Sequence, residues 1–352
     1  MVPTLSHTKI QSQNIILLGF GFVLGLVILA SLSLGAFQIP FPQTLAILFD
    51  QIGISVGTFE VQQENVLIQI RVPRVLMAML VGGGLGISGA ALQGLFRNPL
   101  VEPGLIGVSS GAALFAVIFM VLVPAASALV WIKAVGLPLF AFVGGLIHVL
   151  AVYYLSKTQG KTDSATLILA GVAINALAAS LIGLVLFFAD DSALRSFTFW
   201  SLGDLGGATW SKIPVALTLI AAPTFLLLFN TKQLNALALG EQEAFHMGVN
   251  VQQVKLRLLI CSALVVGVGV SMVGMIGFVG LVVPHLIRIL FGADHRLVLP
   301  GSFLLGAILL NFADLIARLI VIPAEMPIGV ITALVGAPFF IWLIFNLNKS
   351  RN

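Results

Sequence analysis

Charged residues and cysteine are scarce in this sequence. Only 9% of its 352 residues are charged and 59% are hydrophobic, whereas soluble domains carry about 25% charged residues. The single cysteine, Cys261, lies in an apolar run, so an intrachain disulfide is excluded and we interpret Cys261 as a small packing residue. A soluble chain could not bury this much apolar surface, and the composition therefore predicts a membrane protein.

Two further absences narrow the function. No G-x-x-x-x-G-K-[ST] segment occurs, so we expect this chain not to bind a nucleotide through a phosphate loop. The net charge is +4, but the basic residues are scattered between apolar runs and form no dense basic stretch. Nucleic acid is therefore not an expected partner.

Continuous apolar stretches of about 20 residues follow one another along the chain, which is the length that a membrane helix needs. They predict an all-α polytopic membrane protein with about ten transmembrane helices in a single domain, 1–352, because backbone groups in lipid must pair within the helix. The first run, Ile15–Leu34, is longer than a signal-peptide core and is expected to be a retained span. The expected spans are 14–34, 74–95, 104–123, 136–156, 165–189, 212–230, 255–275, 277–291, 297–320 and 328–347.

The orientation follows from the basic residues. With the N-terminus inside, the inner loops and tails hold about eleven of the 17 Lys and Arg residues. This excess predicts that both termini lie in the cytoplasm.

Two segments between spans are more than plain loops. The outer segment 194–208 carries the aromatic residues Phe197, Phe199 and Trp200 followed by glycines, which predicts a short half-helix near the membrane surface. The inner segment 231–252 has a partly apolar helical face and is punctuated by Gly240 and Gly248. It is expected to form two short helices that dock a soluble partner.

Three long stretches carry a resemblance to a known family. They are IRVPRVLMAMLVGGGLGISGAALQGLFRNPLVEPGLIGVSSGAAL (70–114), LALGEQEAFHMGV (237–249), and GFVGLVVPHLIRILFGADHRLVLPG (277–301) with PAEMPIGVITALVGAPFFIWLI (323–344). These resemble the permease subunits of the ABC importers for cobalamin, ferric siderophores and haem. Residues 169–210 are most similar to the haem permeases.

The resemblance implies a type II ABC importer permease fold and transport of haem across the inner membrane, with a ferric siderophore or cobalamin as alternative cargo. It implies a homodimer with two cytoplasmic ATPase subunits and a periplasmic substrate-binding protein. The chain itself would be no enzyme and would bind no cofactor, because ATP and Mg²⁺ belong to the ATPase.

Candidate functional positions fall into four groups. The first is the substrate path, for which the aromatic residues Phe197, Phe199 and Trp200 are candidates. The arginines on which the binding protein would dock have no acidic partner nearby in the sequence. Ala165 departs from the family's pair of hydroxyl residues beside Ser164. The three groups carried over from the family are the docking residues Arg71, Arg74 and Arg318, a cytoplasmic gate of Asn98, Leu100 and Ser164, and the ATPase-coupling residues Gly240, Glu241, Ala244, His246 and Gly248.

An alternative hypothesis, that the protein is an enzyme, rests on the segment Gly107-Val108-Ser109-Ser110-Gly111, which matches the G-x-S-x-G elbow of serine hydrolases. An intramembrane serine protease would need His148 or His285 as a base. The motif lies at the start of a membrane span and not after a strand, so transport is the favoured reading. No metal or haem ligand is assigned.

Overall fold

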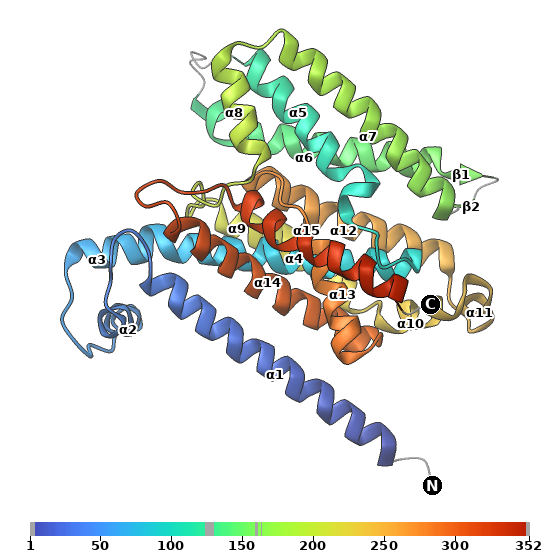
Figure 1. The fold of residues 1–352 in the computed structure, drawn as a ribbon, viewed down its shortest axis with the longest axis horizontal. Coiled ribbons are helices and arrows are strands. Elements are labelled where there is room, and N and C mark those ends of the chain that lie inside the picture. Colours follow the sequence, from blue (N-terminus) through green and yellow to red (C-terminus); the bar gives the residue numbers. More distant parts are fainter. Residues whose placement is uncertain (1–3, 124–129, 159–160, 163, 350–352) are drawn as a thin grey trace.

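Helix α4 (Val72–Phe96) runs through the middle of a long helical bundle (Figure 1). The structure is a computed structural model that describes residues 4–123, 130–158, 161–162 and 164–349. Nearly every side chain of α4 is buried, because its many glycines and alanines let neighbouring helices approach on all sides. A helix that is apolar all round is the expected centre of such a bundle.

The elements follow one another as helices, with one short hairpin. The hairpin strands pair antiparallel, with Lys157 opposite Thr162. The bounds are α1 (Thr4–Ser33), α2 (Phe41–Asp50), α3 (Val61–Asn65), a π-helix (Val66–Arg71), α4, a 3₁₀ turn (Pro103–Ile106), α5 (Val108–Leu122), α6 (Val130–Leu155), β1 (Lys157–Thr158), β2 (Lys161–Thr162), α7 (Ser164–Phe187), α8 (Asp191–Ser201), α9 (Ile213–Leu228), α10 (Thr231–Leu239), α11 (Glu241–His246), α12 (Val251–Val273), α13 (Val279–Phe291), α14 (His295–Leu319) and α15 (Ile328–Lys349).

Each of the ten ranges expected to span the membrane contains a helix, which confirms the all-α polytopic prediction. By length and composition, six helices among the described residues are able to cross a bilayer unaided, or seven if α9 and α10, which bend by 52°, count as one span. Three expected spans contain shorter apolar helices, namely α5, α13 and the stretch Ile328–Ile341 of α15. These helices complete the bundle by packing against longer ones.

Close backbone contact holds the centre together. A Cβ atom added at Gly82 or Gly86 of α4 would collide with the carbonyl oxygens of Gly306 and Ser302 on α14, and one added at Gly89 would collide with the Gly280 carbonyl on α13. Small residues allow this approach, which gives van der Waals contact where lipid supplies no hydrophobic drive between helices. The glycines of α4 therefore serve helix packing.

The two ends of the bundle differ. Helices α10, α11 and the hairpin lie at one end, together with the start of α1 and the end of α15, while α2 and α3 lie at the other (Figure 1). We refer to these as the α10–α11 end and the α2–α3 end. The start of α1 and the end of α15 therefore lie at the same end of the bundle.

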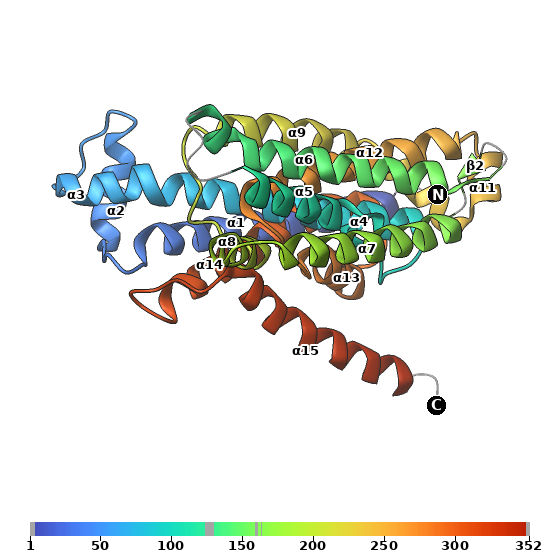
Figure 2. The same ribbon diagram turned by 90° about the horizontal axis from the view of Figure 1, so that it is seen from above.

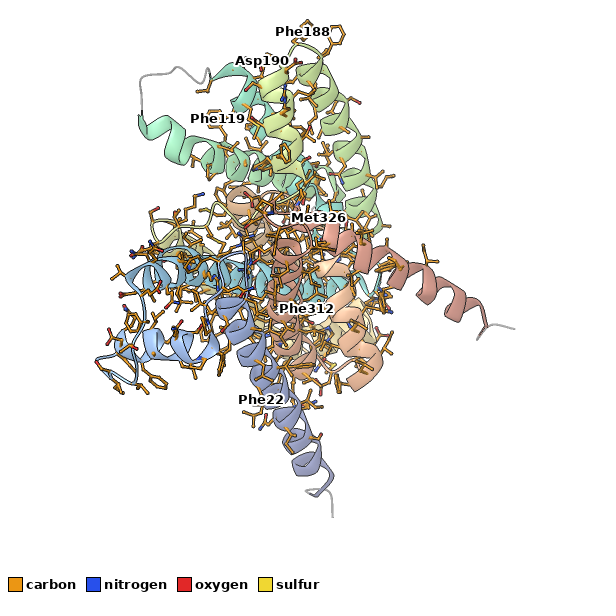
Figure 3. All side chains as sticks on the ribbon, turned by 60° about the vertical axis from the view of Figure 1, so that its left-hand side comes forward. Phe22, Phe119, Phe188, Asp190, Phe312 and Met326 are labelled. Carbon is orange, nitrogen blue, oxygen red and sulfur yellow. The ribbon has the colours of Figure 1, made fainter. Side chains whose placement is uncertain are left out.

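Helices α5 to α8 form a group that stands to one side of the central bundle (Figure 1), and α15 diverges from it (Figure 2). Phe188 and Asp190 mark the turn between α7 and α8 at the far tip of that group (Figure 3). In the most apolar part of α7 only 11% of residues are buried, against 89% in the most apolar part of Val61–Phe96. Phe22 and Phe312 lie on the outside of α1 and α14, as lipid-facing residues do (Figure 3).

Two boundaries differ from the prediction. The helix expected to start at residue 74 continues back to Val61 through a π turn just before Pro73. In a regular α-helix the proline ring clashes with the carbonyl four residues earlier, and the wider turn relieves that clash. The predicted half-helix 194–208 is α8, which ends at Ser201 because Gly203 adopts a φ of +77°.

Candidate functional site

The three arginines predicted to dock a partner come together at the α2–α3 end. Arg74 makes a two-pronged contact with Asp314, with Nη2 2.8 Å from Oδ1 and Nε 3.1 Å from Oδ2. Arg318, one turn along α14 from Asp314, places Nε 3.1 Å from its Oδ2. Asp314 is thus shared by two buried guanidinium groups, and Glu325 adds a second contact to Arg74 at 2.8 Å.

Arg71 has a different partner. Its Nη1 donates to the carbonyls of Leu32 and Ser33 at 2.5 and 2.8 Å, and its Nη2 donates to the Phe37 carbonyl. These carbonyls lie at or just beyond the C-terminal end of α1, where the helix leaves acceptors unsatisfied and its dipole favours a cation. This contact explains why Arg71 is tolerated close to the N-terminus of α4.

That a binding protein docks on these arginines stays a prediction, but they present no open surface in this conformation, and their acidic partners come from distant parts of the chain. All three are buried, with 4%, 7% and 6% of Arg71, Arg74 and Arg318 exposed. The acids that satisfy Arg74 lie 240 and 251 positions away in the chain. The more exposed charge at this cluster is Glu325, whose side chain is 46% exposed.

The segment 231–252 forms two short helices, as expected, with α10 and α11 meeting at Gly240. Gly240 has a φ of +139°, which a residue with a Cβ rarely adopts. Leu234, Leu237 and Ala244 are fully buried, so the apolar face predicted for this segment is turned into the bundle. Ala244 therefore supports the position of α11 and does not itself lie on the surface.

The outward face at the end of α11 carries the predicted coupling residue His246 between two exposed apolar side chains. Phe245 is 69% and Met247 63% exposed, and His246 lies between them on the surface. A hollow of about 950 Å³ adjoins these residues and is lined by Glu241, Gln242 and residues 248–252. Two exposed apolar side chains beside a hollow, within a polar segment, are typical of a protein-docking surface.

An ion pair between a buried lysine and a partly exposed glutamate joins α11 to α12. Lys255 is only 3% exposed, and its Nζ lies 2.7 Å from Oε1 of Glu241 and 2.9 Å from the Thr162 carbonyl. Gln252 accepts hydrogen bonds from the backbone amide and the hydroxyl of Thr162 at 3.1 Å each. The hairpin strand β2 is thereby fixed to the start of α12, a connection that sequence reasoning missed.

The same carboxylate reaches the start of α7. Oε1 of Glu241 accepts a hydrogen bond of 3.5 Å from the Ser164 hydroxyl. Ser164 was predicted as a gate residue and Glu241 as a coupling residue, and the structure brings these two together. We call Glu241, Lys255, Thr162, Gln252 and Ser164 the relay cluster.

Asn98 and Leu100 form a tight turn after α4. The Asn98 side-chain oxygen accepts the Leu100 amide at 2.9 Å, which is the local bond that asparagine makes in turns. Arg97 precedes them with a φ of +50°, and Leu100 is exposed. Within the described part of the chain, no hydrogen bond or ion pair links this turn to Ser164, so the three gate candidates are not one cluster here.

The aromatic residues of α8 divide into two faces. Phe197 is 9% exposed and packs with Ala113 and Val117 of α5, and Trp200 stacks on it at a centroid distance of 6.2 Å. Phe197 is thus a packing residue, which corrects its place in the predicted substrate path. Phe199 is 63% exposed and presents its ring to the outside.

The backbone after α8 is held by its neighbours. Asp204 donates its amide to the Val273 carbonyl at 2.8 Å, and the Gly203 and Leu202 carbonyls accept the amides of Ile328 and Gly329. Irregular backbone at membrane depth needs such protein partners.

At the α10–α11 end, Asp294 connects three helices. Its carboxylate caps α14 and accepts hydrogen bonds from Asn235 of α10 at 2.9 Å and Gln13 of α1 at 3.3 Å. Burial alone would raise the pKa of Asp294, but the Arg296 amide, Asn235 and Gln13 outweigh it and lower the pKa.

Known proteins share this sequence pattern and this fold. Residues 23–346 match the model of the FecCD transport family. The chain is 48% identical over 291 residues to the hemin transport system permease protein HmuU of Yersinia pestis, covering 82% of this chain and 85% of that protein. It is 39% identical over 351 residues to an uncharacterised ABC transporter permease, YvrB, of Bacillus subtilis, covering 98% of each.

This chain belongs to the FecCD transport family. A solved structure described as an inward-facing conformation of a putative metal-chelate type ABC transporter superposes with a TM-score of 0.81 at 32% identity, covering 94% of this chain and 99% of that one. The FecCD chain is thus the membrane-spanning permease subunit of an ABC importer with the type II fold, and the ATPase activity lies in a separate subunit.

The serine-protease alternative is set aside for this FecCD permease. Ser110 lies within hydrogen-bond reach of the Asn175 side-chain oxygen at 2.5 Å, and Asn175 donates to the Gly104 carbonyl at 3.1 Å. His148 Nδ1 lies 3.0 Å from the carbonyl of Gly144, one turn earlier in its own helix. The Gly-Val-Ser-Ser-Gly segment therefore connects α5 to α7, and the relatives are transport permeases.

Proposed function

We propose that this FecCD permease carries haem across the inner membrane. The observation that carries the proposal is the 48% identity to a hemin permease over 82% of the chain, against 39% to the vitamin B12 permease BtuC of Vibrio cholerae over an equal share. Cobalamin and ferric siderophores are the alternative cargoes. The permease binds no cofactor of its own, and ATP and Mg²⁺ are held by its ATPase partner.

The working unit is a homodimer with the path for haem between the two copies. The exposed, apolar surface of α7 supports this, since Leu169, Leu177 and Leu184 are each more than half exposed. The divergence of α15 from the bundle leaves a second surface for a partner copy (Figure 2). Phe199 and part of Trp200 lie at the α2–α3 end of this side and line the entrance for a flat apolar ring.

The α10–α11 end faces the cytoplasm and the α2–α3 end faces the periplasm. The excess of basic residues at the α10–α11 end supports this orientation. Both termini are then cytoplasmic, and the exposed Phe245, His246 and Met247 receive the ATPase subunit. The substrate-binding protein docks at the opposite end, where Glu325 is the most accessible charge of the arginine cluster and Arg71, Arg74 and Arg318 support the surface from beneath.

The relay cluster transmits the closure of the ATPase subunits to the path. A movement of α11 displaces Glu241, and Lys255 and Ser164 carry that displacement to the hairpin and the start of α7. The half-buried Asn98 and the exposed Leu100 follow the end of α4 and narrow the path at the cytoplasmic side. Coupling by ion pairs and packed elements with two arrangements is the physical route by which distant sites influence one another.

The cargo is tested with the complete importer in liposomes. Permease, ATPase and binding protein are reconstituted, and haem, a ferric siderophore and cobalamin are offered separately with ATP. Accumulation of haem supports the proposal, and accumulation of either other cargo without haem overturns it.

Contact of haem with Phe199 and Trp200 is read from quenching of tryptophan fluorescence. In a variant that keeps Trp200 as its only tryptophan, haem delivered by the binding protein is expected to quench the emission. A variant with only Trp210 serves as the control. Equal quenching in both would exclude α8 from the path.

A further inference from the structure

A groove of about 660 Å³ lies on the surface between α6, α9 and α12. Leu219, Ala222 and Leu226 of α9 form one wall, and Ile260 and Leu264 of α12 form the other. Its volume is within the range of about 300–1,000 Å³ that is usual for sites that bind small molecules. The lining is almost entirely hydrocarbon, so the groove fits an apolar chain and no polar solute.

Polar side chains gather where α12 begins. Gln253 and Arg257 lie one helical turn apart on the same face of α12, and both are exposed. Arg257 Nη1 donates to Oδ1 of the buried Asn230 at 3.3 Å, which fixes the guanidinium at the mouth of the groove. Among the described residues no carboxylate forms an ion pair with Arg257, so its charge is left for an external anion.

A second groove provides a contrast. It has a volume of about 410 Å³ and lies between α1, α14 and α15. Val27, Leu309 and Phe312 are among its lining residues, and the lining includes no charged side chain. The pairing of an apolar slot with a fixed cation therefore distinguishes the groove at α12 from an ordinary lipid-facing depression.

We propose that the groove between α6, α9 and α12 binds an anionic phospholipid, with one acyl chain along α9 and α12 and the phosphate at Arg257. Basic side chains between membrane helices at the headgroup level attract anionic lipids. A soluble phosphate does not fit the site, because a single exposed cation holds it weakly and the rest of the lining offers it nothing. Asn230 directly precedes α10, so the lipid is seated beside the first helix of the segment 231–252.

The test uses the full-length permease in detergent and native mass spectrometry. Retention of phosphatidylglycerol is compared with retention of phosphatidylcholine, which has the same chains and no net charge. The unaltered protein is expected to retain phosphatidylglycerol about fivefold better, the factor expected for one basic residue near an anionic surface. Arg257→Gln is expected to abolish this preference and leave the retention of phosphatidylcholine unchanged.

Two controls complete the design. Arg296→Gln removes an exposed cation at the same end but outside the groove, and the preference is expected to remain. Ala222→Phe fills the slot, and retention of both lipids at this site is expected to fall. The decisive variant is Arg257→Gln, because the side chain is exposed and the glutamine amide keeps a donor for Oδ1 of Asn230. A preference that survives in Arg257→Gln, or one that millimolar inorganic phosphate removes, would overturn the proposal.

Discussion

Lys255 and Glu241 form an ion pair of 2.7 Å at a place where only 3% of the lysine is exposed to solvent. The pair joins α11, which carries the exposed Phe245, to α12. A third contact from the same carboxylate, to Ser164, reaches the first residue of α7. One carboxylate thus connects the proposed ATPase surface to the helix that borders the proposed path.

Breaking this pair is expected to uncouple ATP hydrolysis from transport. Lys255→Met removes both this ion pair and the hydrogen bond to the Thr162 carbonyl. Glu241, whose side chain is 38% exposed, then turns to solvent and no longer holds α11 against α12. In Lys255→Met, haem transported per ATP hydrolysed is expected to fall at least about tenfold. The measurement is uptake and phosphate release in the same liposomes.

The control for this prediction is Lys232→Met, which removes an exposed lysine on α10. Exchanging the two charges, Lys255→Glu with Glu241→Lys, is expected to restore part of the coupling. Normal transport by Lys255→Met would show that the relay cluster transmits nothing.

Asp314 is expected to contribute more to stability than Glu325. Asp314→Asn leaves the buried Arg74 and Arg318 without their shared counter-charge, at a cost of about 3–5 kcal/mol. Glu325 is 46% exposed, and Glu325→Gln is expected to cost at most about 1 kcal/mol. Unfolding of the purified permease in mixed micelles measures both costs. Equal losses of unfolding free energy in the two variants would contradict the expected order.

The close contact between α4 and α14 is expected to have no room for one added methyl group. In Gly86→Ala the new Cβ meets the Ser302 carbonyl, so the helices must separate, at a cost of about 1–3 kcal/mol. Gly183 on α7 has no atom within 4 Å of an added Cβ, and Gly183→Ala is expected to leave stability unchanged or to raise it. Thermal unfolding of the two variants side by side is the measurement.

Asp294 is expected to add an acid-sensitive contribution to stability. Because its pKa is lowered in the folded protein, the contribution is complete above the unfolded pKa of about 3.9 and is lost as the pH falls through the lower folded value. Melting temperatures from about pH 6 down to about pH 3 are expected to fall less steeply in Asp294→Asn. Parallel profiles would show that the three hydrogen bonds do not favour the ionised form.

Much of the fold could be predicted from the sequence, because membrane helices are encoded locally by runs of apolar residues. Gly240 and the polar residues around it similarly indicated the break between α10 and α11. The helix expected at 74–95 was predicted too short, since Val61–Arg71 is polar at its start and gave no apolar signal until Val66.

The candidate site was less predictable because its contacts connect distant parts of the chain. Arg74 was predicted as a docking residue, but its partner Asp314 is 240 residues away. Lys255 looks like an ordinary basic residue at the end of a span, and only the folded chain brings it to Glu241. Phe197 and Phe199 are two positions apart, and the rotation of α8 alone decides which of them is buried.

The most direct test of this account is ATP-driven accumulation of haem by the reconstituted importer. Liposomes that contain the permease, its ATPase and its binding protein are given haem with ATP or with a non-hydrolysable analogue, and internal haem is followed over time. The account predicts accumulation with ATP only, and its loss in Lys255→Met while hydrolysis continues. Equal internal haem with and without hydrolysis, or accumulation of cobalamin or a siderophore in place of haem, would contradict it.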